Sequence, residues 1–153
     1  MRRLKRFEFT LQRLKEFREQ TLDTEKGTLA ELRAELARLE AELEDILEDL
    51  ARLNRELVEL YQKGTTALEI SVHKRYINAK QQELHMMRHR ILMQNRKIEM
   101  QLNVVIEATK EVSKLEKLEE HQLEEYKAAE QKENELFIEE FVSNADWRKA
   151  HAN

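Results

Sequence analysis

The amino-acid sequence predicts an all-α protein, a long antiparallel coiled-coil hairpin made of two helices. Three observations support this fold class. Charged residues make up 38% of the 153 residues, with no proline and only two glycines, a composition typical of coiled coils and long helices. Apolar residues recur with a period of 3.5 on both sides of Gly64, and charges of opposite sign alternate in long blocks.

The first helix is expected over about residues 4–62. Its apolar seam advances in alternating steps of three and four residues, at Leu29, Leu32, Leu36, Leu39, Leu43, Ile46, Leu50, Leu53, Leu57 and Leu60. Upstream, a similar pattern occurs at Leu4, Phe7, Leu11 and Leu14. This period imposes a left-handed supercoil, because a straight helix would drift off the seam. From Leu14 the pattern reaches Leu22 through Arg18 in two steps of four residues. This spacing indicates a stutter, which is a local unwinding of the supercoil.

A tight turn is expected at residues 63–66. Gly64 can adopt the left-handed backbone conformation that ends a helix. Thr66 can cap the next helix, and Glu69 stands three residues later, so the two side chains can form a capping box. The first helix therefore stops and a second one begins antiparallel to it.

The second helix is expected over about residues 67–142, so that the hairpin covers residues 1–142. Its strong seam positions recur every seven residues, at Ile70, Ile77, Leu84, Ile91, Ile98, Val105 and Val112. The positions three residues later are weaker or polar, at His73, Lys80, Met87, Gln94, Gln101, Ala108 and Leu115. Polar seam residues lower stability and help to fix the register. Tyr126, Ala129 and Leu136 extend this face, and the remaining tail, residues 143–153, loses the repeat and is expected to be frayed.

The charge pattern supports the antiparallel arrangement. Residues 19–62 carry 5 basic and 13 acidic side chains, whereas residues 63–97 carry 8 basic and 2 acidic ones. Residues 1–18 are basic and residues 98–126 are acidic. If the chain folds at Gly64, residue i faces approximately residue 130 − i, and blocks of opposite sign lie side by side. A parallel homodimer would instead place like charges together.

The composition offers little for catalysis, metals or cofactors. A two-helix coiled coil has no concave site that excludes water, so we expect no enzyme. His85 and His89 are spaced as metal ligands can be, but no third ligand stands within the next turn, and we expect solvated histidines and no cofactor. There is no cysteine, which fits the cytoplasm. No apolar run is long enough for a signal peptide or a membrane span.

The basic segment of residues 88–97 could contact nucleic-acid phosphates. The acidic stretch of the first helix already accounts for these charges, and no aromatic residue for stacking bases lies within the segment. We therefore expect no nucleic-acid partner.

One apolar stripe is not explained by a two-helix hairpin. It repeats every seven residues at Val72, Ala79, Met86, Met93 and Met100. Each position lies two residues after a seam position, about 200° around the helix, so the stripe faces away from the first helix. Methionine is common on adaptable binding surfaces, so we expect another protein there. The alternative is a third helix, supplied by self-association or by the tail folding back.

Several short segments resemble a known family. The opening Phe7-Glu8-Phe9-Thr10-Leu11, followed by Leu14 and Phe17-Arg18, resembles the start of the FliJ family, the small coiled-coil component of the bacterial flagellar export apparatus. Arg75-Tyr76-Ile77 with Gln81-Gln82 matches its early second helix, and residues 111–118 with Tyr126 resemble its C-terminal half. The tail that contains Trp147 is not placed in the family pattern by these segments.

The resemblance implies a stalk in flagellar type III protein export, similar to the central stalk of rotary ATPases. Its open end would enter the hexameric export ATPase and stimulate it, and the regulator of this ATPase would be a further partner. The same protein would contact the membrane export gate and the export chaperones, placing it in the cytoplasm at the inner face of the cell membrane, held there by its partners. For the ATPase contact the expected residues are Phe9, Arg13, Lys117 and Leu118. For the gate or the chaperones they are Tyr61, Tyr76, Met86, His89 and Met93.

Two alternatives stay open at the level of sequence. The stalk of a virulence type III secretion system shares this architecture. A structural coiled coil that self-associates through the methionine stripe is the other.

Overall fold

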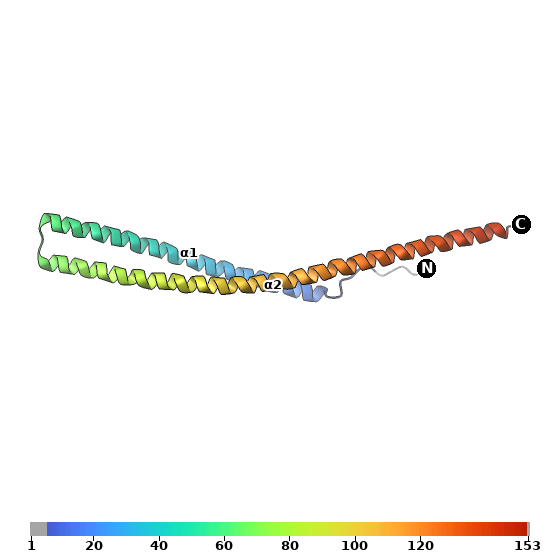
Figure 1. The fold of residues 1–153 in the computed structure, drawn as a ribbon, viewed down its shortest axis with the longest axis horizontal. Coiled ribbons are helices and arrows are strands. Elements are labelled where there is room, and N and C mark those ends of the chain that lie inside the picture. Colours follow the sequence, from blue (N-terminus) through green and yellow to red (C-terminus); the bar gives the residue numbers. More distant parts are fainter. Residues whose placement is uncertain (1–5, 153) are drawn as a thin grey trace. The chain divides into compact units, whose positions relative to one another are not determined.

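Two long helices account for nearly all of the chain. The computed structural model describes residues 6–152, in which α1 spans Gln12–Lys63 and α2 spans Ala67–Ala150 (Figure 1). The predicted all-α helical hairpin is confirmed. The chain divides into two compact units, one of Asp23–Glu107 and the other of Met1–Leu22 with Ala108–Asn153.

The unit of residues 23–107 is a two-helix antiparallel coiled coil. Its buried side chains from α1 are Leu29, Leu39, Ile46 and Leu50, and those from α2 are Ile77, Met87, Gln94 and Val105. Every one of them stands at a seam position that the seven-residue repeat predicts. Each helix buries a single narrow stripe, because a lone partner helix covers only one side of it.

The polar seam residues hydrogen-bond across to the backbone of α1. Gln94 is only 6% exposed and donates from Nε2 to the carbonyl oxygen of Leu32 at 2.9 Å. Gln101 donates in the same way to the carbonyl oxygen of Glu25 at 3.0 Å. His73 Nε2 lies 2.7 Å from the carbonyl oxygen of Leu53. Among the described residues no buried side-chain nitrogen or oxygen lacks a partner, so these layers avoid the cost of an unsatisfied buried group.

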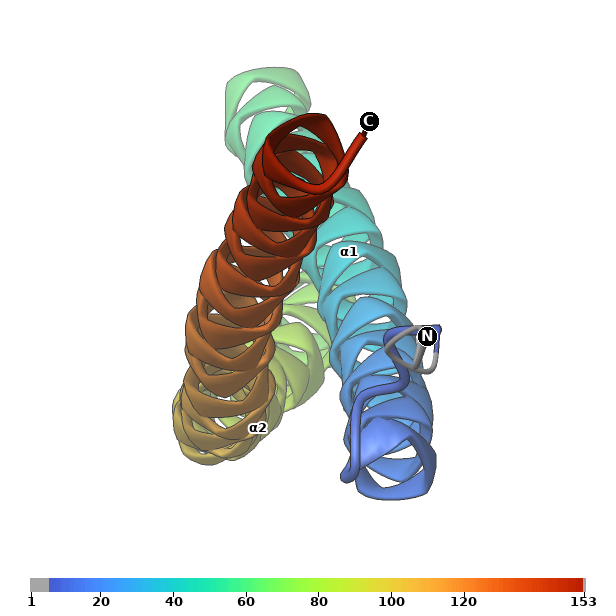
Figure 2. The same ribbon diagram turned by 90° about the vertical axis from the view of Figure 1, so that its right-hand side faces the viewer.

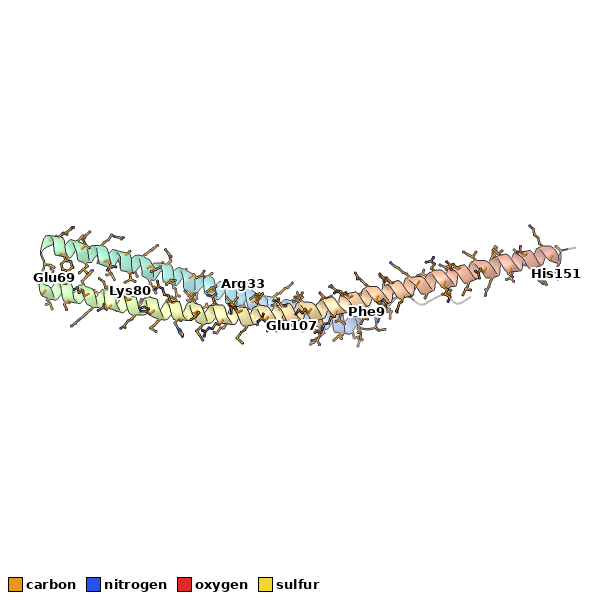
Figure 3. All side chains as sticks on the ribbon, viewed as in Figure 1. Phe9, Arg33, Glu69, Lys80, Glu107 and His151 are labelled. Carbon is orange, nitrogen blue, oxygen red and sulfur yellow. The ribbon has the colours of Figure 1, made fainter. Side chains whose placement is uncertain are left out.

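Charge pairs between the helices confirm the predicted register. Lys80 Nζ lies 3.2 Å from Asp49 Oδ2, and Figure 3 shows Lys80 on the side of α2 that faces α1. Arg90 Nη1 lies 4.0 Å from Glu42 Oε2. In each pair the two residue numbers add to nearly 130. Hydrogen bonds to Glu83 and then to Asp49 raise the pKa of Lys80 above its usual value. Such partly exposed pairs contribute little stability, but they favour this alignment over others.

The turn is built as the sequence predicts. Gly64 has φ of 70°, the left-handed conformation that follows the last helical residue, Lys63. The Thr66 hydroxyl accepts a hydrogen bond from the backbone N–H of Glu69 at 3.2 Å, which caps α2. The Glu69 carboxylate accepts from the hydroxyl of Thr65, so the reciprocal half of the capping box is replaced by this contact.

The start of α1 differs from the prediction. Leu4 lies outside the described residues, and residues 6–11 precede the helix, which begins at Gln12 (blue, Figure 2). Phe7 and Phe9 are turned inward while the residues between and beside them are exposed. This alternation by two is the pattern of an extended segment, since residues two apart in a helix face nearly opposite sides.

The predicted seam at Leu11 and Leu14 was wrong. Leu14 is 40% exposed, whereas the side chain of Lys15 is only 19% exposed. The inward face of α1 instead passes from Leu22 through Arg18 to Lys15. Phe9 then supplies the apolar contact beyond the helix start.

The end of α2 also differs. The helix continues to Ala150 instead of ending near residue 142, and the tail is part of it. Arg148 and Lys149 stand in its last turn, where positive charge complements the helix dipole. The rings of Trp147 and His151 stack with centroids 4.4 Å apart. The seam does not extend as predicted, because Ala129 and Leu136 are exposed.

Replacing Gly64 with alanine should destabilise the hairpin by about 1 kcal/mol, because an L side chain at positive φ is strained. No atom lies within 4 Å of the added Cβ, so backbone strain is the only cost. Gly27→Ala is the matched control: Gly27 lies inside α1 with equally open space, and this substitution should stabilise by roughly 0.5–1 kcal/mol. Urea unfolding of both variants measures the difference, and effects of the same sign would contradict the assigned turn.

Replacing Gln94 with leucine should stabilise the protein by about 1 kcal/mol, since the added apolar burial exceeds the loss of one neutral hydrogen bond. The Leu32 carbonyl keeps its bond within the helix, so no group is left unsatisfied. Gln94→Ala removes the bond without refilling the space and should destabilise. Thermal unfolding followed by circular dichroism separates them. If both variants lose stability equally, Gln94 contributes more than a tolerated polar layer.

Candidate protein-interaction surfaces

The first candidate surface is the end at which residues 6–22 pair with residues 108–126, called the paired end below. The rings of Phe7 and Tyr126 lie with centroids 5.6 Å apart. Lys15 Nζ donates to Glu119 Oε2 at 2.6 Å. The side chains of Thr10 and Gln122 are also within hydrogen-bonding distance, at 3.4 Å. Three kinds of contact therefore fix residues 7–15 along α2.

At the paired end, the ammonium group of Lys15 lies close to two carboxylates. Its hydrogen bond to Glu119 raises its pKa above the usual lysine value, opposed by partial burial. The same side chain lies 3.8 Å from Glu19. Since a raised lysine pKa means that the folded state favours the charged form, this contribution to stability is present at neutral pH and is lost only as pH rises through the folded-state pKa.

The residues that the sequence assigns to the ATPase contact fall into two groups. Arg13, Lys117 and Leu118 are exposed, as a contact residue must be. Phe9 is only 7% exposed and packs inside the paired end, as Figure 3 indicates by its place beside α2. It cannot touch a partner directly while this packing is intact. The spacing of Phe7 and Phe9 by two residues is the sequence signal that could have revealed this.

The second candidate surface is the methionine face, which consists of Val72, Ala79, Met86, Met93 and Met100. All five are exposed, with Met86 at 68% and Met100 at 71%. Arg96 Nη1 lies 3.8 Å from the sulfur of Met93. Exposure of long apolar side chains over four heptads leaves a surface that a two-helix unit does not cover.

The residues assigned to the gate or the chaperones are also exposed. Met86 and Met93 belong to the methionine face, and Tyr76 and His89 stand on α2 within the same unit. Tyr61 is exposed on the last turns of α1, before the turn at Gly64. All five therefore lie in the unit of residues 23–107, where they are accessible to a partner.

A shallow groove of about 360 Å³ borders the methionine face, and the sequence analysis missed it. Its lining comes from both helices and consists of Glu42, Asp45, Ile46, Asp49, Lys80, Glu83, Met86, Met87 and Arg90. The α1 side of this groove carries three carboxylates. Because residues of both helices line the groove, it is a feature of their pairing that no single-helix pattern reveals.

The third candidate surface is the distal part of α2. Phe137, Ile138, Phe141 and Val142 are all exposed, Phe141 at 67%. They lie on one side of the helix, since residues one, four and five apart fall within an arc of about 140°. These residues lie inside the predicted second helix, but the seven-residue repeat followed there, through Tyr126, Ala129 and Leu136, gave no indication of this face.

Neither a metal centre nor a membrane span emerges from the described residues. In residues 6–152 no three His, Cys, Asp or Glu side chains are grouped so that they could hold a metal ion. Over the same range no helix is both long enough and apolar enough to cross a membrane.

Comparison with known proteins identifies the family. The model of the family described as "FliJ: Flagellar FliJ protein" matches residues 7–151. No curated protein and no solved structure matches the chain. The match covers both helices, the turn between them and the paired end, and the residues that resemble the family lie within it. The chain belongs to the FliJ family of flagellar proteins.

Proposed function

We propose that this protein is a non-enzymatic coiled-coil stalk of the bacterial flagellar type III export apparatus. In this role it binds and stimulates the hexameric export ATPase and links it to the export gate and the export chaperones. It works in the cytoplasm at the inner face of the cell membrane, held there by its partners. The observation that carries the proposal is the family match over residues 7–151, which includes the hairpin and the paired end.

The paired end is the proposed ATPase contact. Arg13, Lys117 and Leu118 are exposed there and supply charge and an apolar group. Phe9 acts through its neighbours: buried against α2, it holds the extended residues before α1 in place. A prealigned end binds a ring at a lower entropic cost than a loose one.

The unit of residues 23–107 is the proposed contact for the gate or the chaperones. Tyr61, Tyr76, Met86, His89 and Met93 supply exposed aromatic, apolar and imidazole groups. Aromatic residues and methionine are enriched at protein interfaces. Because these residues belong to a different unit from the paired end, one protein can engage two partners.

The seam suggests how the stalk passes on changes in the ring. A rod that contacts the subunits unequally responds to each nucleotide state through differences in contact free energy. The apolar layers supply stiffness, and the polar layers at Lys80 and Gln94 supply local flexibility. Leucine at both positions should therefore impair export, and unchanged export would count against this role.

Two other functions are consistent with parts of the structure. A virulence secretion stalk would have the same helices, and a deletion strain that stays motile but loses secretion of virulence proteins would favour it. The exposed methionine face favours a self-associating structural coiled coil. A stable dimer in light scattering that Met86→Glu with Met93→Glu abolishes would support that function.

The ATPase activity of the cognate export ATPase should rise when this protein is added, together with hexamer formation. Lys117→Glu with Leu118→Glu should lower the stimulation severalfold, because both exposed contacts at the paired end are lost. Met86→Glu with Met93→Glu is the control and should leave stimulation unchanged. If the wild-type protein neither binds nor stimulates the ATPase, the proposed function is wrong.

Phe9→Ala should open the paired end locally. Removing a buried phenylalanine costs about 3 kcal/mol in a core, and the loss should be confined to residues 6–22 and their contacts on α2. Hydrogen exchange measures it: amides near the start of α1 should exchange faster, while those of residues 29–60 stay protected. Phe17→Ala, at an exposed position, should change nothing. Equal effects of the two substitutions would show that Phe9 does not anchor the end.

A further inference from the structure

The methionine face has the geometry of a second coiled-coil seam. Its apolar residues repeat every seven positions, as the seam with α1 does, so it keeps a constant angle to that seam along α2. From Val72 to Met100 it covers four heptads, about 42 Å of helix. A face of this length and period matches another helix better than a globular surface, whose contacts have no such repeat.

One flank of the methionine face is positively charged and lacks partners. Midway between successive apolar positions stand Arg75, Gln82, His89 and Arg96, all exposed. Among the described residues neither Arg75 nor Arg96 has an ion-pair partner within 4 Å, and Arg96 Nη1 lies 3.8 Å from the sulfur of Met93. These guanidinium groups are available to carboxylates of a docked helix.

The other flank carries ion pairs within the hairpin. It borders the groove, where Arg90 pairs with Glu42 and Lys80 pairs with Asp49 and Glu83. The carboxylates on the α1 side would repel a helix that is acidic all round. The charge arrangement therefore accepts a helix whose carboxylates lie on one side, toward Arg75 and Arg96.

We propose that the methionine face binds an acidic amphipathic α-helix of another protein, which packs along residues 72–100 of α2 as a third strand. The partner's apolar residues lie on Met86, Met93 and Met100. Its carboxylates lie on the flank of Arg75, His89 and Arg96. This inference rests on the proposed function, of which it specifies the chemistry of the gate or chaperone contact.

The test uses two synthetic peptides of about four heptads with leucine at the seam positions. One carries glutamate at the flanking positions, and the other carries lysine. Like charges keep each peptide monomeric. Fluorescence anisotropy should show the glutamate peptide binding the full-length protein at least tenfold more tightly than the lysine peptide, with a preference that falls as salt is raised.

Three variants locate the binding. Arg75→Glu with Arg96→Glu should reverse the preference, so that the lysine peptide binds more tightly. Met86→Ser with Met93→Ser should lower the affinity for the glutamate peptide at least tenfold. Leu47→Ser with Val58→Ser, at exposed positions on α1, is the matched control and should have no effect. Circular dichroism checks that each variant keeps its helical content.

Several outcomes would overturn the inference. Equal affinity for the two peptides, or an unchanged preference in the Arg75→Glu with Arg96→Glu variant, would show that the partner helix is not recognised by its acidic charge. If the methionine variant and its control lose equal affinity for the glutamate peptide, the methionine face is not the binding site. If the protein alone forms a dimer that Met86→Ser with Met93→Ser abolishes, a second copy covers the face instead.

The ATPase assay with the same variants separates this inference from the proposed function. Stimulation by the wild-type protein without specific peptide binding would overturn the acidic helix alone. Specific peptide binding without any stimulation would instead contradict the stalk function.

Discussion

The alignment of α1 with α2 across the turn at Gly64 is the constraint on which the rest of the structure depends. A left-handed residue at that one position reverses the chain, and the seven-residue repeat then decides which layers meet. A slip of either helix would break the side-chain bonds of Gln94 and Gln101 to backbone carbonyls of α1. It would also separate the cations of α2 from the carboxylates of α1. Apolar layers alone tolerate such a slip, because one leucine layer resembles the next, and so the polar layers supply the specificity.

The narrowness of the seam explains why so much of the molecule is available to partners. Two helices cover only one side of each other, and each heptad offers five further positions to solvent. Most of these hold charged residues, which contribute solubility and weak ion pairs. Where they hold methionine or phenylalanine instead, the apolar surface has no function within the hairpin. Among the described residues the methionine face and the distal face of α2 are such places.

The ion pairs within the hairpin also decide which charges remain unpaired on its surface. The acidic block of α1 aligns the hairpin by pairing with Lys80 and Arg90, and it thereby uses up one flank of the methionine face. Arg75 and Arg96 stand on the other flank, where no carboxylate of the described residues lies within 4 Å of them, and their charge is available to the proposed partner. Intramolecular pairing therefore shapes the intermolecular surface, since a cation that is already neutralised attracts an acidic ligand weakly.

The sequence by itself determined the fold class, the turn, the seam within the unit of residues 23–107 and its register, because each depends on periodicity and local conformation that are written in the order of residues. It also predicted that Met86 and Met93 would be exposed, since their angle from the seam follows from helical geometry. Tertiary structure decided the rest. Phe9 is buried because α2 lies beside an extended segment, and α1 begins at Gln12 because that contact outweighs continuing the helix. Which arginines of α2 remain unpaired depends on which carboxylates of α1 lie across the seam from them. The distance between such an arginine and a carboxylate joins residues far apart in the chain, and no local sequence pattern contains it.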